Sequence, residues 1–169
     1  MGVTIESFSG DCREALKADP GKGGVEKVRQ LLEEALKDTA FVETHLGPDA
    51  DSPRNIIYED PELKFCVIAH VYKGASTGNP HDHADAWAIY GQAAGVTRMT
   101  AWRKLAGPDG EQPGQVEEVR SFDQGPGDAS AWHVGQLHSP AREGETRLIR
   151  IEGRNMDGVQ RDKYERPAA

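Results

Sequence analysis

The chain has 169 residues, of which 28 % are charged and 37 % hydrophobic, and its formal net charge is −8. An acidic chain disfavours nucleic acid as a partner, and no apolar run approaches the roughly 20 residues that span a bilayer. The N-terminus lacks a basic segment followed by an apolar stretch, so we expect a cytoplasmic protein without a signal peptide. Two scattered cysteines, Cys12 and Cys66, are too few for a disulfide framework.

The first fifty residues are predicted to be largely helical. A short helix is expected around Cys12–Lys17, and residues 20–24, which read Pro-Gly-Lys-Gly-Gly, indicate a break after it. Val25–Lys37 carries apolar residues at helical spacing, which predicts an amphipathic helix packed against the outside of a β core. We therefore expect a single domain in which a helical segment, residues 1–50, packs on a barrel formed by residues 51–169.

The rest of the chain reads as a series of short strands. Runs rich in Val, Ile, Thr and aromatic residues alternate with turns that contain Gly, Pro, Asp or Asn. The predicted strands are Asn55–Tyr58, Leu63–Tyr72, Trp87–Gly91, Thr97–Leu105, Gln115–Phe122, Ser130–Val134 and Thr146–Glu152. Many short strands separated by turn signals predict an all-β core of the double-sheet barrel or jelly-roll type.

The most informative motif is His81-Asp82-His83. Two histidines one residue apart on an extended segment point to the same face, because side chains alternate along a strand. Their imidazoles could therefore hold one metal ion together, and neutral imidazole is the commonest transition-metal ligand in proteins. On this pair alone, a chance occurrence of two ordinary histidines stays open.

Two glycine-framed segments resemble the paired motifs of the cupin superfamily. The residues that carry this resemblance are His81, His83, Gly95, Gly127, Gly135 and His138. The resemblance implies a small double-stranded β-helix with His81, His83 and His138 as metal ligands. Ala88 stands where that superfamily has a glutamate ligand, so the implied site has three histidines and no carboxylate. Three protein ligands leave positions open for a substrate, which favours an enzyme over a structural site.

Within the superfamily, residues 54–156 look most like the cysteine dioxygenase group of thiol dioxygenases. That resemblance implies a non-haem ferrous ion, bound by three histidines, at which a thiol and dioxygen form a sulfinic acid. It also implies that Arg54 binds the acid group of the substrate through its bidentate fork. Arg150 and Glu152 replace a histidine and a tyrosine of the group, so the cysteine–tyrosine crosslink of the mammalian-type enzymes cannot form. We take both as candidate pocket residues, although Glu152 as a rim carboxylate paired with Arg150 or Arg154 stays open.

The predicted function is a metal-dependent oxidoreductase that oxidises a small organic substrate, above all a thiol, with dioxygen. Fe(II) is the expected metal, and Mn, Ni or Zn are alternatives because histidine binds all of them. We expect a monomer or homodimer with no nucleic-acid or membrane partner. Two other functions stay open: a three-histidine enzyme of another type, such as a lyase, an isomerase or a diketone-cleaving dioxygenase, and a non-catalytic cupin that binds or senses a small molecule.

Several further residues have two possible roles. Asp82 and Asp85 could orient the imidazoles from an outer shell or lie in solvent. His133 is expected in an outer-shell or surface position, and His70 either in the core or in the pocket wall. His45, beside a Gly-Pro pair, is expected in a loop.

Overall fold

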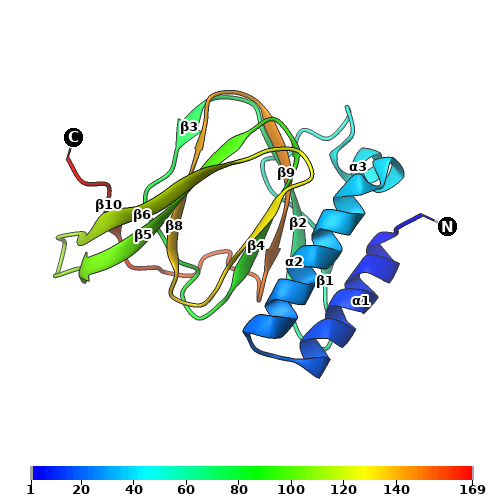
Figure 1. Cartoon of the computed structure of the whole chain (residues 1–169), viewed down its shortest axis with the longest axis horizontal. Coiled ribbons are helices and arrows are strands. Elements are labelled where there is room, and N and C mark those ends of the chain that lie inside the picture. The colour runs from blue at the N-terminus through cyan, green and yellow to red at the C-terminus, as the bar shows by residue number, and fades with distance from the viewer. Residues whose placement is uncertain (1, 169) are drawn as a thin grey trace.

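The computed structural model describes residues 2–168 and arranges them as two facing β-sheets with three helices against one of them (Figure 1). The helices are α1 (Ile5–Ala18), α2 (Lys22–Lys37) and α3 (Thr39–Leu46). The strands are β1 (Asn55–Glu59), β2 (Cys66–Tyr72), β3 (Ser76–Thr77), β4 (Ala88–Ala94), β5 (Thr97–Ala106), β6 (Gly114–Gln124), β7 (Ala129–Trp132), β8 (Leu137–Arg142), β9 (Thr146–Glu152) and β10 (Tyr164–Glu165). No helix within residues 2–168 is long and apolar enough to cross a membrane.

The strand order explains how distant segments meet. One sheet runs β1-β2-β9-β4-β7 and the other runs β10-β6-β5-β8-β3. β9 therefore lies between β2 and β4 and pairs with both in antiparallel register. The layer between the two sheets is a second core, and it contains Tyr90, Met99, Trp132 and Leu148 from both sheets. This arrangement agrees with the predicted double-sheet architecture.

Alternation along β9 separates the two faces of the first sheet. Ile149 and Ile151 belong to the core shared with the helices, whereas Leu148 belongs to the core between the sheets. Because successive side chains point to opposite faces, Arg150 and Glu152 share the inner face with Leu148. The register of β9 thus carries two charged residues into the interior.

The amphipathic helix predicted at Val25–Lys37 is confirmed as α2, which begins earlier, at Lys22. The break was expected over residues 20–24, but residues 22–24 belong to α2, so that part of the prediction is wrong. Gly24 is buried where α2 follows α1, and a Cβ there would lie 1.8 Å from the carbonyl oxygen of Asp19. The glycine is needed for this close approach and does not interrupt the helix.

Close packing between α2 and the sheet depends on Gly91 of β4. A Cβ at this position would lie 2.5 Å from Leu32 and 2.9 Å from Leu36 of the helix. Both leucines are buried, as is Val28 one turn before Leu32. The apolar stripe of α2 therefore packs on the outer face of the sheet. Figure 1 shows the helix lying against that sheet.

Two features of the helical segment differ from the prediction. α1 is longer than expected because Thr4 forms a capping box with Ser7 at its N-terminus. α3 was not predicted, so the expected loop position of His45 is wrong. The side chain of Asp38 caps α3 by accepting from the backbone N–H groups of Ala40 and Phe41, and Phe41 is buried in the core.

The predicted strands are largely confirmed, and Thr146–Glu152 matches β9 in both bounds. The main omission is β8, which pairs with β5 from Leu137 to Ala141. Pro140 lies inside this strand, and a proline within a run argues against strand structure because it has no N–H to donate. β3 and β10 were also missed, and each is only two residues long.

Candidate metal centre

The structure brings the three predicted ligands together. His81 and His83 lie in the loop that leads into β4, and His138 lies on β8. Reciprocal backbone hydrogen bonds of 2.9 Å join His81 to His138. One potential ligand atom from each of the three imidazoles lies within 4.8 Å of the other two. The expected extended segment is a single β-bridge at His81 and not a strand, yet both imidazoles still belong to the cluster.

Backbone carbonyls orient two of the imidazoles. The Nδ1 atom of His81 is 2.9 Å from the carbonyl oxygen of Asn79, and the Nδ1 atom of His138 is 3.0 Å from that of Gln136. A carbonyl only accepts, so each Nδ1 carries the proton and each Nε2 keeps its lone pair. This is how metal-binding imidazoles are commonly oriented. The Nδ1 atom of His83 is buried without a partner among residues 2–168.

The expected outer-shell carboxylates do not perform this role. Asp82 accepts the backbone N–H of Ala84 at 3.0 Å, which stabilises the turn after the first two histidines. Asp85 forms an exposed ion pair with Arg154 at 2.7 Å. Among the described residues, neither carboxylate forms a hydrogen bond with an imidazole of the cluster, so the solvent-facing alternative holds for Asp85.

The electrostatic setting keeps the three imidazoles neutral. Burial lowers the pKa of His83 to about 2, and the pKa of His138 lies well below its ordinary value of 6.5 for the same reason. Burial also lowers the pKa of His81. Proximity of the imidazoles adds to the effect, since a proton on His81 would repel one on either neighbour. Neutral nitrogen lone pairs directed at one point suit a cation better than a proton.

Distances within the cluster fit a metal ion. The Nε2 atoms of His83 and His138 are 3.2 Å apart. Two nitrogens bound to one ion at about 2.1 Å lie about 3.0 Å apart at a right angle and about 3.4 Å apart at a tetrahedral angle. The donor set and its spacing therefore fit a transition metal.

Tyr90 is the site residue that the sequence analysis missed. Its hydroxyl oxygen lies 2.8 Å from Nε2 of His83 and 3.1 Å from Nε2 of His138. Its side chain is buried, and burial raises the pKa of the phenol. Tyr90 comes two residues after Ala88 on β4, so strand alternation places it on the same face as the position of the missing glutamate. That periodicity could have identified it.

A charged network continues from Tyr90 toward Glu152. The guanidinium of Arg150 lies 5.6 Å from the ring centroid of Tyr90. Glu152 is 1 % exposed and forms ion pairs of 3.2 Å with both Arg150 and Arg54. Burial lowers the pKa of Arg150, but Tyr90, Glu152 and Tyr72 outweigh it and raise the pKa above its ordinary value. Glu152 thus faces the interior and is not a rim carboxylate.

Arg54 is held by carboxylates of the protein itself. Besides Glu152, it pairs with Asp157 at 2.8 Å and contacts the side-chain oxygen of Asn155 at 3.3 Å. Its side chain is 25 % exposed. The predicted substrate anchor is therefore near the interior, but two acidic groups already balance its charge.

The other histidines and Trp132 have separate environments. His70 is buried, with Nδ1 2.6 Å from the carbonyl oxygen of Pro53 and 3.0 Å from the hydroxyl of Tyr72, which matches the core alternative. Trp132 stacks on His138 with ring centroids 4.6 Å apart. His133 lies after β7, where its backbone N–H donates to Gln136, and it takes no part in the cluster.

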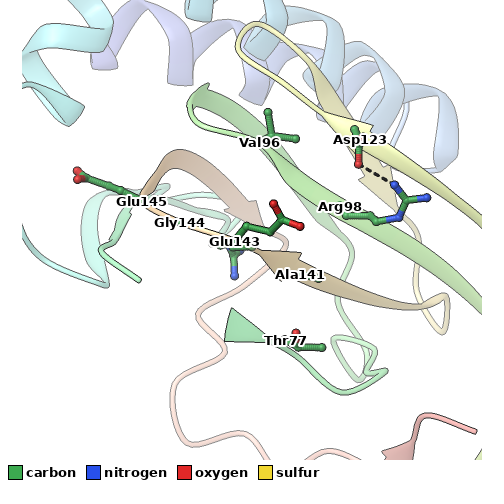
Figure 2. Close-up of a pocket in the computed structure, with 9 residues that line it drawn as sticks. Thr77, Val96, Arg98, Asp123, Ala141, Glu143, Gly144 and Glu145 are labelled. Carbon is green, nitrogen blue, oxygen red and sulfur yellow. Dashed lines mark hydrogen bonds and ion pairs between the residues drawn. The ribbon is translucent and has the colours of Figure 1, made fainter. Parts of the chain in front are cut away.

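Two pockets differ in their relation to the histidine cluster. One, of about 520 Å³, is lined on one side by residues 79–81 and on the other by residues 161–165. His81 is thus the ligand nearest to the outside. Figure 2 shows the other, of about 430 Å³, where Arg98 and Asp123 form an ion pair of 3.1 Å. No histidine of the cluster lines this second pocket.

Fold and site together define a class of protein: a two-sheeted β-barrel with a three-histidine candidate metal centre. No family model and no curated protein matches the chain. Solved structures similar to it include cupin superfamily proteins, all at low similarity. KdgF from Halomonas sp. is 18 % identical over 63 % of this chain and 82 % of its own, with a TM-score of 0.47.

Two other solved structures are similar to about the same degree. The cupin domain of Schizosaccharomyces pombe Cnp3 is 10 % identical over 64 % of this chain and 66 % of its own, with a TM-score of 0.49. A Klebsiella pneumoniae protein with a double-stranded β-helix domain is 13 % identical over 74 % of this chain and 89 % of its own, with a TM-score of 0.47. At this level of similarity the solved structures identify no reaction for this chain.

Proposed function

We propose that this protein is a mononuclear non-haem iron enzyme that oxidises a small organic substrate, a thiol above all, with dioxygen. The observation that carries the proposal is the cluster of three neutral imidazoles, His81, His83 and His138, whose potential ligand atoms lie within 4.8 Å of one another. A set of neutral ligands leaves a ferrous ion its full double-positive charge, so a bound metal would favour the thiolate form of a substrate and bring it beside dioxygen. Oxidation of a thiol to a sulfinic acid takes both oxygen atoms of dioxygen and needs no other reductant.

Contacts within the protein hold the ligand imidazoles in place. His81 and His138 are oriented by the carbonyls of Asn79 and Gln136, which keeps Nε2 free for the metal. Trp132 packs flat on His138 and limits the space available to water. These contacts fix the orientation of two of the three ligand imidazoles.

Substrate binding is assigned to the charged network beside the cluster. Arg150 and Arg54 share one buried carboxylate, Glu152, and Arg54 also pairs with Asp157. Arg150, which has only the shared carboxylate, is therefore the cation that we assign to an acid group on the substrate. Glu152 sets the positions of both guanidinium groups and is not free to act as a base.

Oxygen uptake tests the proposal. Protein reconstituted with Fe(II) is offered cysteine, cysteamine, 3-mercaptopropionate and mercaptosuccinate, and oxygen consumption and bound iron are both measured. We expect uptake with one thiol, and its loss in His138→Ala. His133→Ala is the matched control, because this histidine lies in the turn just before β8 but outside the cluster. No uptake by protein shown to hold iron would rule out thiol oxidation.

One observation favours a second candidate function. Arg150 and Glu152 stand where the thiol-dioxygenase resemblance calls for a histidine and a tyrosine, and they form an ion pair instead. A site with a different outer shell suits a three-histidine enzyme of another reaction type, such as a lyase or an isomerase. Turnover under strict exclusion of oxygen would select this candidate over the first.

A further inference from the structure

The hydroxyl oxygen of Tyr90 completes a triangle with two imidazole nitrogens. It lies 2.8 Å from Nε2 of His83 and 3.1 Å from Nε2 of His138, and these two nitrogens are 3.2 Å apart. Two ligand atoms at about 2.0–2.2 Å from one ion and at right angles to each other are about 2.8–3.1 Å apart. The three separations are thus close to those of three neighbouring ligands on one metal ion.

Hydrogen bonds can serve at most two of the three sides of this triangle. Nε2 of His138 is a lone-pair acceptor, because Nδ1 of the same ring donates to the carbonyl of Gln136. The phenol has a single proton and can donate it to only one of its two nitrogen neighbours. The only other proton available is one on Nε2 of His83, and it can serve only one more side, so one of the three sides has no hydrogen bond. A cation would satisfy all three electron-rich atoms at once.

The position of Tyr90 along β4 supplies what Ala88 lacks. Both residues are buried and face the interior, two positions apart on the same strand. Both lie opposite the inner face of β9, with Ala88 facing Glu152 and Tyr90 facing Arg150. The methyl group of Ala88 leaves no oxygen where the cupin motif has its glutamate, and the nearest oxygen on that face of β4 is the phenol of Tyr90.

The surroundings of Tyr90 suit an oxygen ligand. The guanidinium of Arg150 lies 5.6 Å from its ring centroid and favours electron density on the oxygen. The ring packs in the core between the sheets with Met99, Trp132 and Leu148, so its orientation is fixed by apolar contacts on several sides. An oxygen held this firmly needs no movement to reach a cation at the cluster.

We propose that Tyr90 is the fourth protein ligand of the metal centre and takes the place of the missing glutamate. The centre is then a three-histidine, one-tyrosine site, and it suits transition metals that accept both nitrogen and phenolic oxygen, iron above all. This inference concerns the ligand set, and it stands whether or not the substrate is a thiol.

The ferric form of the iron-loaded protein gives a direct test. Tyrosine oxygen bound to ferric iron produces a charge-transfer band in the visible range, which imidazole ligands alone do not produce. We expect the band in the wild-type protein and its loss in Tyr90→Phe, a change that removes one oxygen and keeps the packed ring. Tyr72→Phe is the matched control, since Tyr72 also lies in the barrel but its hydroxyl contacts His70.

Metal affinity gives a second readout that does not depend on turnover. In competition with a chelator, Tyr90→Phe should bind Zn(II) at least about tenfold more weakly than the wild type does. Loss of a residue that only hydrogen-bonds to a metal ligand already lowers metal affinity about tenfold or more. Tyr72→Phe should bind like the wild type. A wild-type ferric spectrum without the band would overturn the inference without any variant. Equal spectra and affinities for Tyr90→Phe and the wild type would also overturn it.

Discussion

Ala88 on β4 and Glu152 on β9 lie directly opposite each other in an antiparallel ladder, and both face the interior. The thiol-dioxygenase resemblance expected from the sequence would place the cysteine and the tyrosine of a crosslink at these two positions. The backbone geometry therefore brings the two positions together, and only the identity of the residues excludes the bond. The carboxylate at position 152 instead serves as the shared partner of two arginines.

The shared role of Glu152 predicts a stability cost. Glu152→Gln leaves Arg54 and Arg150 without their common buried carboxylate, so we expect the free energy of unfolding to fall by about 3–5 kcal/mol. Denaturant unfolding of the metal-free protein measures this change. Glu145→Gln is the control, because Glu145 is half exposed in its ion pair with Arg147 and should change stability by less than about 1 kcal/mol. Equal losses in both variants would contradict the prediction.

Replacing Arg142 should cost little stability, in contrast to replacing Glu152. It is 9 % exposed, its guanidinium lies 4.3 Å from the ring centroid of Tyr72, and its Nε atom has no partner among the described residues. Replacing a buried charge by an apolar side chain of similar volume is often neutral or stabilising, against about 1–2 kcal/mol for a lost cation–π contact. We expect Arg142→Met to change the free energy of unfolding by less than about 1 kcal/mol.

The same denaturant experiment compares Arg142→Met with Glu152→Gln. A loss as large as that of Glu152→Gln would show that Arg142 has a stabilising partner in solution. Burial lowers the pKa of Arg142, which agrees with a cation that lacks a neutralising carboxylate.

The burial of His70 should make the stability of the folded chain depend on pH. Burial lowers the pKa of His70 to about 3, whereas an unfolded histidine has a pKa near 6.5. Between these values the unfolded chain binds a proton that the folded chain refuses. Stability is therefore fully present above about pH 6.5 and falls as the pH drops toward 3, by about 1.4 kcal/mol per pH unit for this one group.

A variant isolates the contribution of His70 from those of the metal-binding histidines. In metal-free protein, His70→Gln should flatten the curve of unfolding free energy against pH between about pH 4 and 6 by roughly that slope. Denaturant titrations at a series of pH values measure both curves. Parallel curves for the two proteins would mean that His70 is not the buried neutral group described above.

Metal binding should stabilise the folded chain through the histidine cluster. At a free metal concentration of a thousand times Kd, a single site adds about 4 kcal/mol. We expect Zn(II) to raise the melting temperature of the wild-type protein and to have a much smaller effect on His83→Ala. His133→Ala, outside the cluster, should respond like the wild type. A similar shift in His83→Ala would place the metal elsewhere on the chain.

Local patterns predicted much of the fold. The apolar stripe at residues 25–37 is α2, and the β-branched run Thr146–Glu152 is β9 with the same bounds. Both signals come from side-chain periodicity, which depends only on neighbours in the chain. The missed α3 and β8 have weaker local signals, an eight-residue length in one and Pro140 in the other, and tertiary pairing decides them.

The sequence by itself determined the two histidines of the His-x-His motif, the amphipathic helix and the strand-rich remainder, because each depends on spacing within a short segment. Only the tertiary structure decided that Tyr90 meets His138 from 48 residues away and that Glu152 turns inward between two arginines. These contacts depend on strand register, and a slip of one residue would move every side chain to the opposite face. Register is set by many long-range pairs together, so no short segment contains it.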